Sequence, residues 1–243
     1  MKTIALFLCI LWTGLASLHA QDDGRVVKFR LLCYEQVGDV TKALMLGEGG
    51  GKQEVMFYSG GFGPQMTGKF TGGKVRFFTE APGPNNKPVV TMVAEGDLGP
   101  TAVQMFLLFP QAKGKTPLYK VYAYDDLEKS FPMGSTRVIN LAACPVRLNL
   151  AGADMPPIKP GGVEVYPQVK KADEWQMFTA RVDFALEEKK WTPVVTQSWK
   201  SSSRKRDWVI TQFDPDSHQP AIRIYQDIPP WRETVLPVGG KSR

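Results

Sequence analysis

Apolar and polar residues alternate along most of this chain, and the alternation is clearest between residues 176 and 213. The apolar members of its first run are Phe178, Ala180, Val182, Phe184 and Leu186. A period of two places such residues on one face of a pleated strand, and that face must be buried. Polar turns then lead to two similar runs at 191–199 and 207–213. The pattern predicts three consecutive antiparallel strands in a meander.

The remainder of the chain follows the same pattern, with apolar and aromatic runs separated by glycine and proline. Further strands are predicted at 26–35, 41–46, 53–58, 74–79, 88–95, 101–109 and 118–124. No long segment repeats apolar residues at the helical period, and 23 glycines with 19 prolines would interrupt most helices. Closely spaced strands without helical crossovers favour sandwiches. We predict an all-β fold of two tandem antiparallel β-sandwich (Ig-like) domains after an N-terminal signal peptide.

A comparison of the two halves of the chain favours this division. Segments 89–95, 103–110 and 118–126 have counterparts of similar character at 194–199, 208–215 and 221–227. Such self-similarity is typical of a duplicated unit. The alternatives are one large sandwich, or a likeness that arises only because apolar residues dominate the comparison. The predicted boundaries are a signal peptide at 1–20, domains at 21–130 and 131–230, and a flexible tail at 231–243.

The first twenty residues have the features of a secretory signal peptide. Lys2 precedes an apolar run at 4–18, and Ala20 stands before the polar residues that begin at Gln21. Leu18 is larger than the small residue preferred at its position, so an uncleaved anchor is the alternative. No later apolar run approaches the roughly 20 residues that cross a bilayer. The sequence therefore predicts a secreted or periplasmic protein with no transmembrane segment in its mature chain.

The chain carries a formal net charge of +6, and a group of its basic residues is predicted to share one end of the meander. The group is Lys170, Lys171, Lys200, Arg204, Lys205 and Arg206, flanked by Trp199 and Trp208. Strands that run up, down and up would bring these residues together as an anion-binding surface for a glycan or another polymer. The alternative is that charged turns only protect exposed strands. An envelope protein or an anionic polymer is the expected partner, and nucleic acid is not expected.

Side chains suited to catalysis are scarce. His19 lies in the predicted leader and His218 in a polar turn, which leaves no histidine in a strand to act as a general base. One histidine and two distant cysteines do not supply four zinc ligands, and neither a metal nor a cofactor is predicted. Paired carboxylates leave a carbohydrate-active hydrolase as the alternative. The candidates are Asp125, Asp126, Asp214 and Asp216, although acids at strand ends also fix turns.

Cys33 and Cys144 are the cysteines that follow the predicted leader. An oxidising compartment permits a disulfide between them. Both also stand at inward positions of predicted strands, where cysteine serves as a small apolar residue. The sequence leaves both alternatives open.

Residues 131–141 are similar to a motif of exported bacterial β-proteins, and this resemblance implies no activity. The leader, the β pattern and the scarcity of catalytic side chains together favour an exported non-catalytic binding or structural protein of the bacterial cell envelope.

Overall fold

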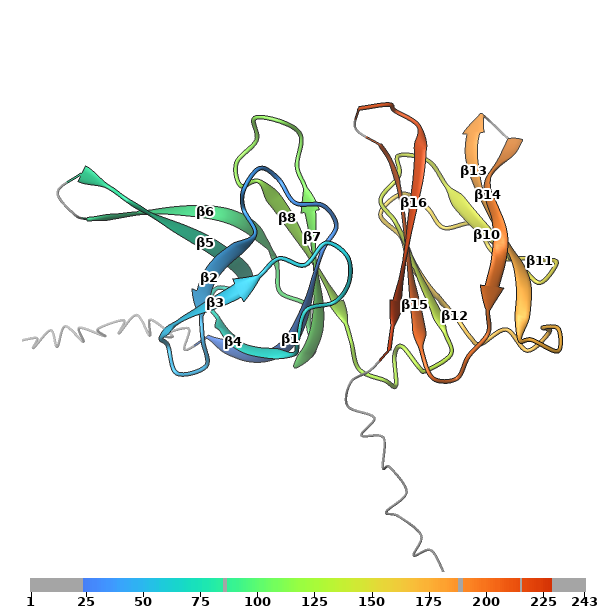
Figure 1. Ribbon diagram of the computed structural model, residues 1–243, viewed down its shortest axis with the longest axis horizontal. Coiled ribbons are helices and arrows are strands. Elements are labelled where there is room, and N and C mark those ends of the chain that lie inside the picture. The colour runs from blue at the N-terminus through green and yellow to red at the C-terminus, as the bar shows by residue number, and fades with distance from the viewer. Residues whose placement is uncertain (1–23, 85–86, 188–189, 215, 229–243) are drawn as a thin grey trace, which may run out of the picture.

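The computed structural model describes residues 24–84, 87–187, 190–214 and 216–228 (Figure 1). All the long regular elements of this part of the chain are strands, sixteen in number, so the predicted all-β class is confirmed. No helix among these residues is long and apolar enough to cross a membrane. The predicted leader at 1–20 and the predicted tail at 231–243 lie outside the described residues.

Strands β1 to β8 form a first unit, a single sheet in the order β3-β2-β5-β6-β8-β7-β1-β4. Their bounds are β1 Arg25–Cys33, β2 Lys42–Leu46, β3 Lys52–Met56, β4 Met66–Phe70, β5 Lys74–Pro82, β6 Pro88–Asp97, β7 Val103–Pro110 and β8 Tyr119–Asp125. The sheet curls until Gly47, next to β2, bridges Gly68 of β4. The curled sheet encloses a core that includes Phe29, Phe77 and Phe106. Its curvature thus buries one apolar face without a second sheet.

Strands β9 to β16 form a second unit of two four-stranded sheets, in the orders β11-β10-β13-β14 and β12-β9-β15-β16. Their bounds are β9 Thr136–Asn140, β10 Val146–Leu150, β11 Ala153–Asp154, β12 Val163–Tyr166, β13 Met177–Glu187, β14 Lys190–Lys200, β15 Arg206–Phe213 and β16 Pro220–Asp227. Val138 and Val209 of one sheet share a core with Leu148 and Val182 of the other. The second unit therefore has the layered arrangement of a β-sandwich.

The predicted meander is correct for two of its three strands. β13 and β14 pair antiparallel. Ala180, Val182 and Phe184 are buried as expected, whereas Leu186 is exposed. β15 belongs to the other sheet, between β9 and β16, and both of its faces are buried. Val209 packs in the sandwich core and Trp208 packs in a cluster with residues of the first unit. A strand that is covered on both faces has apolar residues on each of them, so its alternation does not show which sheet it joins.

The pairing is mixed, which corrects the purely antiparallel prediction. β1 pairs in parallel with β7, β6 with β8, and β9 with β15. These pairs need no helical crossover, because intervening strands carry the chain back across the molecule. The spacing of turns along the sequence does not reveal which strands become neighbours.

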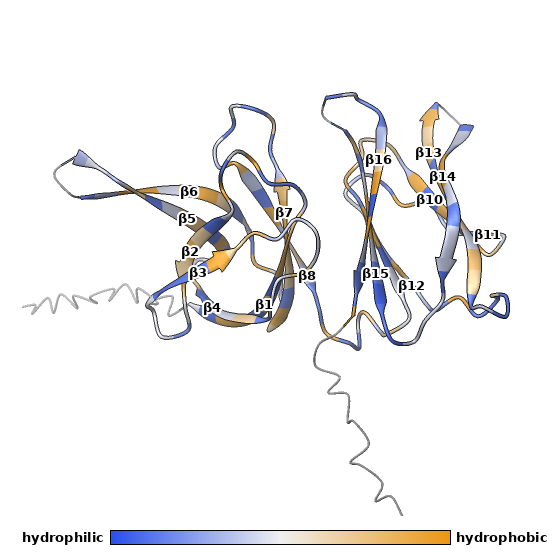
Figure 2. Ribbon diagram, viewed as in Figure 1, coloured by the Kyte–Doolittle hydropathy of each residue, from blue (hydrophilic) through white to orange (hydrophobic). Residues whose placement is uncertain are grey.

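The two units share a buried interface. Leu32 and Leu107 of the first unit lie in one cluster with Ile139 and Ile210 of the second, around the fully buried Trp208. Figure 2 shows hydrophobic residues along β7 and a hydrophilic stretch at the lower end of β15. The interface is therefore apolar along much of its length and charged at one end.

The predicted possibility of a disulfide between Cys33 and Cys144 is not realised, and both thiols are free. Cys33 is buried in the core of the first unit, whereas Cys144 packs against the core of the second. The two cysteines therefore lie in different cores, and each acts as a small apolar residue.

Candidate functional site

The predicted basic surface lies where the 167–176 loop meets the turn between β14 and β15. The Ser201 N–H donates to the Gln176 carbonyl at 2.8 Å, and its hydroxyl donates to the Val169 carbonyl at 2.7 Å. These two bonds hold the loop against the turn, so the segment with Lys170 and Lys171 lies beside the turn that follows Lys200.

Four of the six predicted cations remain at the surface. They are Lys170, Lys171, Lys200 and Arg204, which are exposed and have no ion-pair partner within the described residues. We call these four residues the basic end. Unpaired exposed cations keep their full charge available to an anionic ligand.

Lys205 and Arg206 do not belong to the basic end. The Lys205 ammonium donates to both carboxylate oxygens of Asp207, at 2.7 and 2.6 Å. Arg206 is only 1% exposed, and its guanidinium faces the first unit. Both cations are therefore paired with carboxylates of the same chain.

The predicted aromatic flank also lies inside the protein. Trp199 is buried and packs edge-on against Phe178, with ring centroids 6.3 Å apart. Trp208 is buried between the units, with the Arg137 guanidinium 4.6 Å from its ring. Neither ring offers a face to a ligand.

A different tryptophan lies on the surface of the same loop. Trp175 is 72% exposed, and its backbone N–H donates to the Asp173 carboxylate at 2.9 Å. The next residue is Gln176, whose carbonyl accepts the hydrogen bond from Ser201. Sequence reasoning missed Trp175 because the loop has no periodicity, although a lone tryptophan between polar residues was a usable signal.

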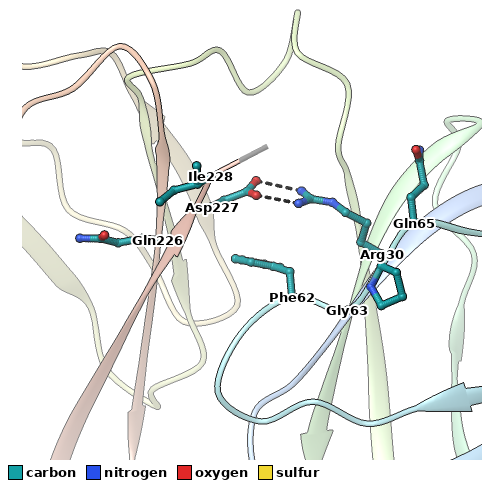
Figure 3. A pocket seen from close by; sticks show the side chains of 8 residues that line it. Arg30, Phe62, Gly63, Gln65, Gln226, Asp227 and Ile228 are labelled. Atoms are coloured by element: carbon teal, nitrogen blue, oxygen red, sulfur yellow. Dashed lines mark hydrogen bonds and ion pairs between the residues drawn. The ribbon is translucent and has the colours of Figure 1, made fainter. Parts of the chain in front are cut away.

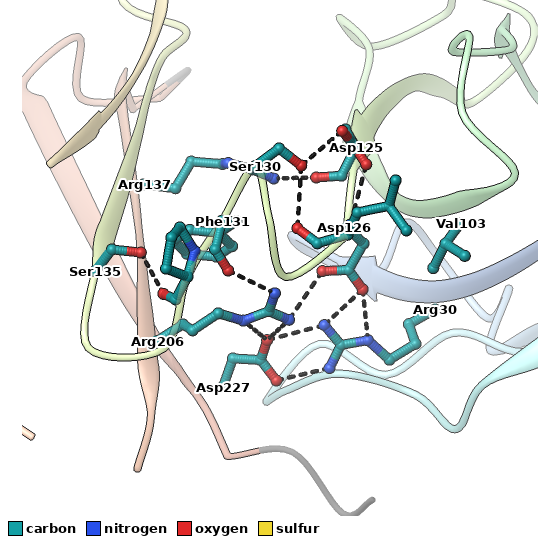
Figure 4. A network of polar contacts seen from close by, with 12 residues as sticks. Arg30, Val103, Asp125, Asp126, Ser130, Phe131, Ser135, Arg137, Arg206 and Asp227 are labelled. Carbon is teal, nitrogen blue, oxygen red and sulfur yellow. Dashed lines mark hydrogen bonds and ion pairs between the residues drawn. The ribbon is translucent and has the colours of Figure 1, made fainter. Parts of the chain in front are cut away.

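A buried network of four charged side chains joins the two units (Figure 4). Its members are Arg30, Asp126, Arg206 and Asp227. Arg30 of β1 donates to Asp126 at 2.9 Å and to Asp227 at 2.6 Å. Arg206 of β15 donates to the same two carboxylates, at 2.9 Å to Asp126 and 2.9 Å to Asp227. Two positive and two negative groups thus alternate in a closed ring. Sequence reasoning missed this ring because its members lie up to 197 positions apart.

The network favours the charged forms of Arg30 and Asp227 in spite of their burial. Burial by itself would raise the pKa of Asp227, but hydrogen bonds and charges from Arg30 and Arg206 outweigh it and hold that pKa below its ordinary value. Burial would likewise lower the pKa of Arg30, yet the bonds to Asp227 and Asp126 raise it. Charges this well paired are neutralised by one another, so we assign the ring a structural role.

A hollow of about 560 Å³ opens beside this ring (Figure 3). Arg30, Phe62, Gln65, Asp227 and Ile228 are among the residues that line it. Figure 3 shows the Arg30 guanidinium hydrogen-bonded to the Asp227 carboxylate, and both residues line the hollow. Because these charged residues satisfy one another, the hollow offers no unpaired charge to a ligand.

The candidate catalytic carboxylates lie in turns and ion pairs. Asp125 accepts hydrogen bonds from the Leu127 N–H at 3.0 Å and the Ser130 hydroxyl at 2.6 Å. Asp214 accepts from the Ser217 N–H at 2.8 Å. Burial favours a higher pKa at Asp125, but the bonds from Ser130 and Leu127 leave it lowered, and the bonds from Ser217 lower the pKa of Asp214.

A general acid for glycoside hydrolysis needs a raised pKa and a second carboxylate across a cleft. The fourth candidate, Asp216, is exposed in the same turn as Asp214. His218 is exposed there too, with a left-handed backbone φ of 54°. These features are typical of a solvated turn.

Within the described part of the chain, no group of three or more His, Cys, Asp and Glu residues is arranged to hold a metal ion. The chain matches no known protein-family model, and no curated protein is significantly similar to it. The function is therefore inferred from the geometry of the site.

Proposed function

We propose that the protein is an exported, non-catalytic binding or structural component of the bacterial cell envelope that holds an anionic polymer at its basic end. Export is part of the proposal, and it is supported by the charged, apolar and small residues of segment 1–20. The secreted or periplasmic location would bring the basic end into contact with anionic envelope glycans and polymers.

The observation that carries the proposal is the juxtaposition of four unpaired cations with an exposed aromatic ring. The hydrogen bonds of Ser201 fix the loop of Lys170, Lys171 and Trp175 against the turn of Lys200 and Arg204. Separate exposed charges contribute little each, but a polymer with regularly spaced anions contacts several of them together. The Trp175 ring adds a face on which a sugar can stack.

Acidic residues of the loop do not cancel this surface. Asp173 accepts hydrogen bonds from the Trp175 and Met177 N–H groups at 2.9 and 2.7 Å and so fixes the loop. Glu174 is the remaining exposed acid of the segment. The basic end therefore keeps an excess of positive charge.

The test is retention on immobilised polygalacturonate, an anionic polysaccharide, at low salt. We expect the wild-type protein to be retained and to be released in about 1 M salt, which shortens the Debye length to ~3 Å. A variant with Lys170, Lys171, Lys200 and Arg204 all replaced by alanine should elute in the void.

The control replaces four other exposed lysines that have no ion-pair partner among the described residues, namely Lys28, Lys87, Lys115 and Lys159. It removes the same net charge and should still be retained. Equal retention of the two variants would mean that the whole surface charge, rather than the basic end, binds the polymer.

The alternative function, a carbohydrate-active hydrolase, has less support. It needs two of the acids Asp125, Asp126, Asp214 and Asp216 to face each other as an acid and a base. Asp126 is paired with Arg30 and Arg206, and the hydrogen bonds of Asp125 and Asp214 go to their own turns.

We also propose that the two units are tandem Ig-like domains at 21–130 and 131–230 that arose by duplication. The order β8-β7-β1 of the first unit has the same antiparallel and parallel pairings as β16-β15-β9 of the second. Arg30 of β1 stands opposite Met105 of β7, as Arg137 of β9 stands opposite Trp208 of β15. If the two strand pairs are superposed in this register, Arg30 is equivalent to Arg137 and Met105 is equivalent to Trp208. Asp126 and Asp227 likewise each follow an equivalent tyrosine by two residues.

A further inference from the structure

We propose that the outer half of the β5–β6 hairpin pairs with the same hairpin of a second copy of the protein, one β6 strand against the other. We call this outer half, residues 80–82 and 88–91, the arm. Figure 1 shows the β5–β6 hairpin extending away from the other strands of the first unit. The pairing is antiparallel, around a two-fold axis at Val90, and gives a weak dimer.

The arm lies outside the core of its own unit. The inner half of the hairpin supplies Phe77 and Val93 to that core. Every residue of the arm is exposed, and Val89 and Val90 are 48% and 55% exposed. A two-stranded hairpin without further packing is marginally stable in water. A third strand against the arm would therefore stabilise it.

Both long edges of the arm are unpaired within the described structure. β8 pairs with β6 only from Ala94 to Gly96. β2 pairs with β5 only at Phe78. The backbone groups along either side of the arm therefore have no neighbouring strand among the described residues.

The hydrogen-bonding pattern of the hairpin shows which groups of β6 face outward. The Gly83 N–H donates to the Lys87 carbonyl at 3.1 Å, which makes these two residues a hydrogen-bonded pair. Such pairs alternate with non-hydrogen-bonded pairs along an antiparallel ladder. Val90 then stands in a non-hydrogen-bonded pair, so its N–H and C=O point away from β5. Pro82 and Pro88 agree with this alternation, since they form another such pair and have no N–H to donate.

The outward edge of β6 has none of the charges that commonly protect an edge strand from pairing. Residues 88–94 include no charged side chain and are rich in β-branched residues. In contrast, the edge strand β3 of the same sheet carries Lys52 and Glu54. The opposite edge of the arm carries Glu80, which pairs with Lys52. The β6 edge is therefore the side of the arm that accepts another strand.

The identity of the partner follows from the groups on this edge. Outward N–H and C=O groups in a row are satisfied by an extended backbone, so the partner is a strand. The same edge of a second copy meets this need, because a two-fold axis makes two antiparallel strands self-complementary. With Val90 opposite its counterpart, Val89 lies opposite Thr91 of the second copy. Positions 88–92 then face one another and include no charge, so the pairing opposes no like charges.

The pairing does not use the basic end, because that surface belongs to the second unit and the arm belongs to the first. A dimer therefore offers two basic ends to one polymer, which increases its overall affinity. This consequence rests on the proposed function, whereas the pairing of the arms does not.

Sedimentation velocity of a chain that begins at Gln21 tests the pairing over about 1 to 500 µM protein. Residues 88–92 form a short edge, below the roughly 1,200 Å² that stable interfaces bury. We therefore expect a monomer–dimer equilibrium with a Kd of about 100 µM. Val90→Lys places two ammonium groups at the two-fold axis and should weaken the dimer about tenfold or more.

Ala81→Lys is the matched control. Ala81 stands opposite Val89 in the same arm, so its replacement adds the same charge, but on the strand away from the two-fold axis. This variant should dimerise as the wild type does. Because Ala81 and Val90 are both exposed, circular dichroism should show both variants folded.

Disulfide cross-linking provides a second readout that locates the contact. In a Cys144→Ala background, Val90→Cys should form a linked dimer on air oxidation faster than Ala81→Cys, because only Val90 meets its own counterpart at the axis. Equal rates for the two cysteine variants would contradict the proposed register.

A wild-type protein that stays monomeric up to about 500 µM would overturn the inference. Equal dimerisation of the wild type and Val90→Lys would overturn it as well, since the dimer would then use another surface. Loss of the dimer in Ala81→Lys would do the same, because charge on the arm rather than the β6 edge would then govern association.

Discussion

The Nη1 atom of Arg30 and the Oδ1 atom of Asp227 lie 2.6 Å apart, although 197 positions separate the two residues along the chain. Arg30 lies in the first strand of the described structure and Asp227 at the end of the last. Their contact closes the ring that includes Asp126 and Arg206. The two ends of the described chain are therefore joined by buried charges, and the stability of the interface depends on both.

Replacement of Arg30 by methionine should lower the free energy of unfolding by roughly 3 to 5 kcal/mol. The substitution keeps much of the side-chain volume but leaves Asp126 and Asp227 with one cation in place of two. Urea denaturation followed by tryptophan fluorescence measures the loss, because Trp208 is buried in the interface. Lys42→Met is the control. The Lys42–Glu54 pair is exposed, at 57% and 50%, and should contribute less than about 1 kcal/mol. Similar losses in the two variants would contradict a special role for the ring.

The ring should also make stability depend on pH in the acid range. The pKa of Asp227 is lower in the folded protein than its ordinary 3.8, so the folded state binds the proton less well than the unfolded state. Its contribution is therefore complete above pH 3.8 and is lost as the pH falls through the folded-state value. Burial raises the pKa of Asp207, which acts in the opposite direction.

Comparison of the wild type with Asp227→Asn isolates this effect. The variant should be less stable at neutral pH, and the difference between the two proteins should shrink as the pH falls below 3.8. Urea titrations over this range provide the measurement. A difference that does not change with pH would show that Asp227 acts only through its shape.

Cys33 should be unreactive in the folded protein. Burial raises the pKa of its thiol to about 11, so little thiolate is present at neutral pH. In a chain that begins at Gln21, Ellman's reagent should modify the partly exposed Cys144 slowly and Cys33 only in denaturant. Cys144→Ala should then give no signal under native conditions. Rapid native labelling of that variant would mean that the first core opens readily.

Replacement of Gly96 by alanine should destabilise the protein for steric reasons. A Cβ atom at this position would lie 2.0 Å from the Val121 carbonyl oxygen, across the parallel pair of β6 and β8. We expect Gly96→Ala to cost roughly 1 to 3 kcal/mol, because backbone must move to accept it. Gly51→Ala, which meets nothing within 4 Å, should change stability by less than about 0.5 kcal/mol. Thermal unfolding of the two variants provides the comparison.

Tyr34→Phe should not destabilise the protein. Because the hydroxyl has no partner within the described residues, its removal relieves a desolvation cost of about 1 kcal/mol. Tyr225→Phe should behave in the same way. A loss of about 1 kcal/mol in Tyr34→Phe would instead show that the hydroxyl is bonded inside the protein.

The sequence predicted the bounds of several individual strands well. The predicted runs 191–199 and 207–213 differ by one residue at most from β14, Lys190–Lys200, and β15, Arg206–Phe213. Alternation is a local property, so it can be read without knowing the partner strands. β4, Met66–Phe70, was missed because Gly68 breaks its apolar pattern. That glycine has a packing reason, since a Cβ there would meet the Met45 side chain at 2.0 Å.

The sequence predicted the site less well, because the fate of a charged residue depends on distant parts of the chain. Arg204 and Arg206 belong to one basic turn, yet the first is exposed and the second is buried against Asp126 and Asp227. Nothing within the turn distinguishes them. The carboxylates that neutralise Arg206 lie 80 and 21 positions away, and only the fold brings them to it.

The shared interior of the two units has a consequence for the nine residues that connect β8 to β9 after Asp126. The peptide chain there is not what keeps the units together, because the apolar cluster around Trp208 and the closed set of charges span the gap by themselves. A protease cut within residues 127–135 would therefore yield two fragments that migrate as a single particle until a denaturant separates them.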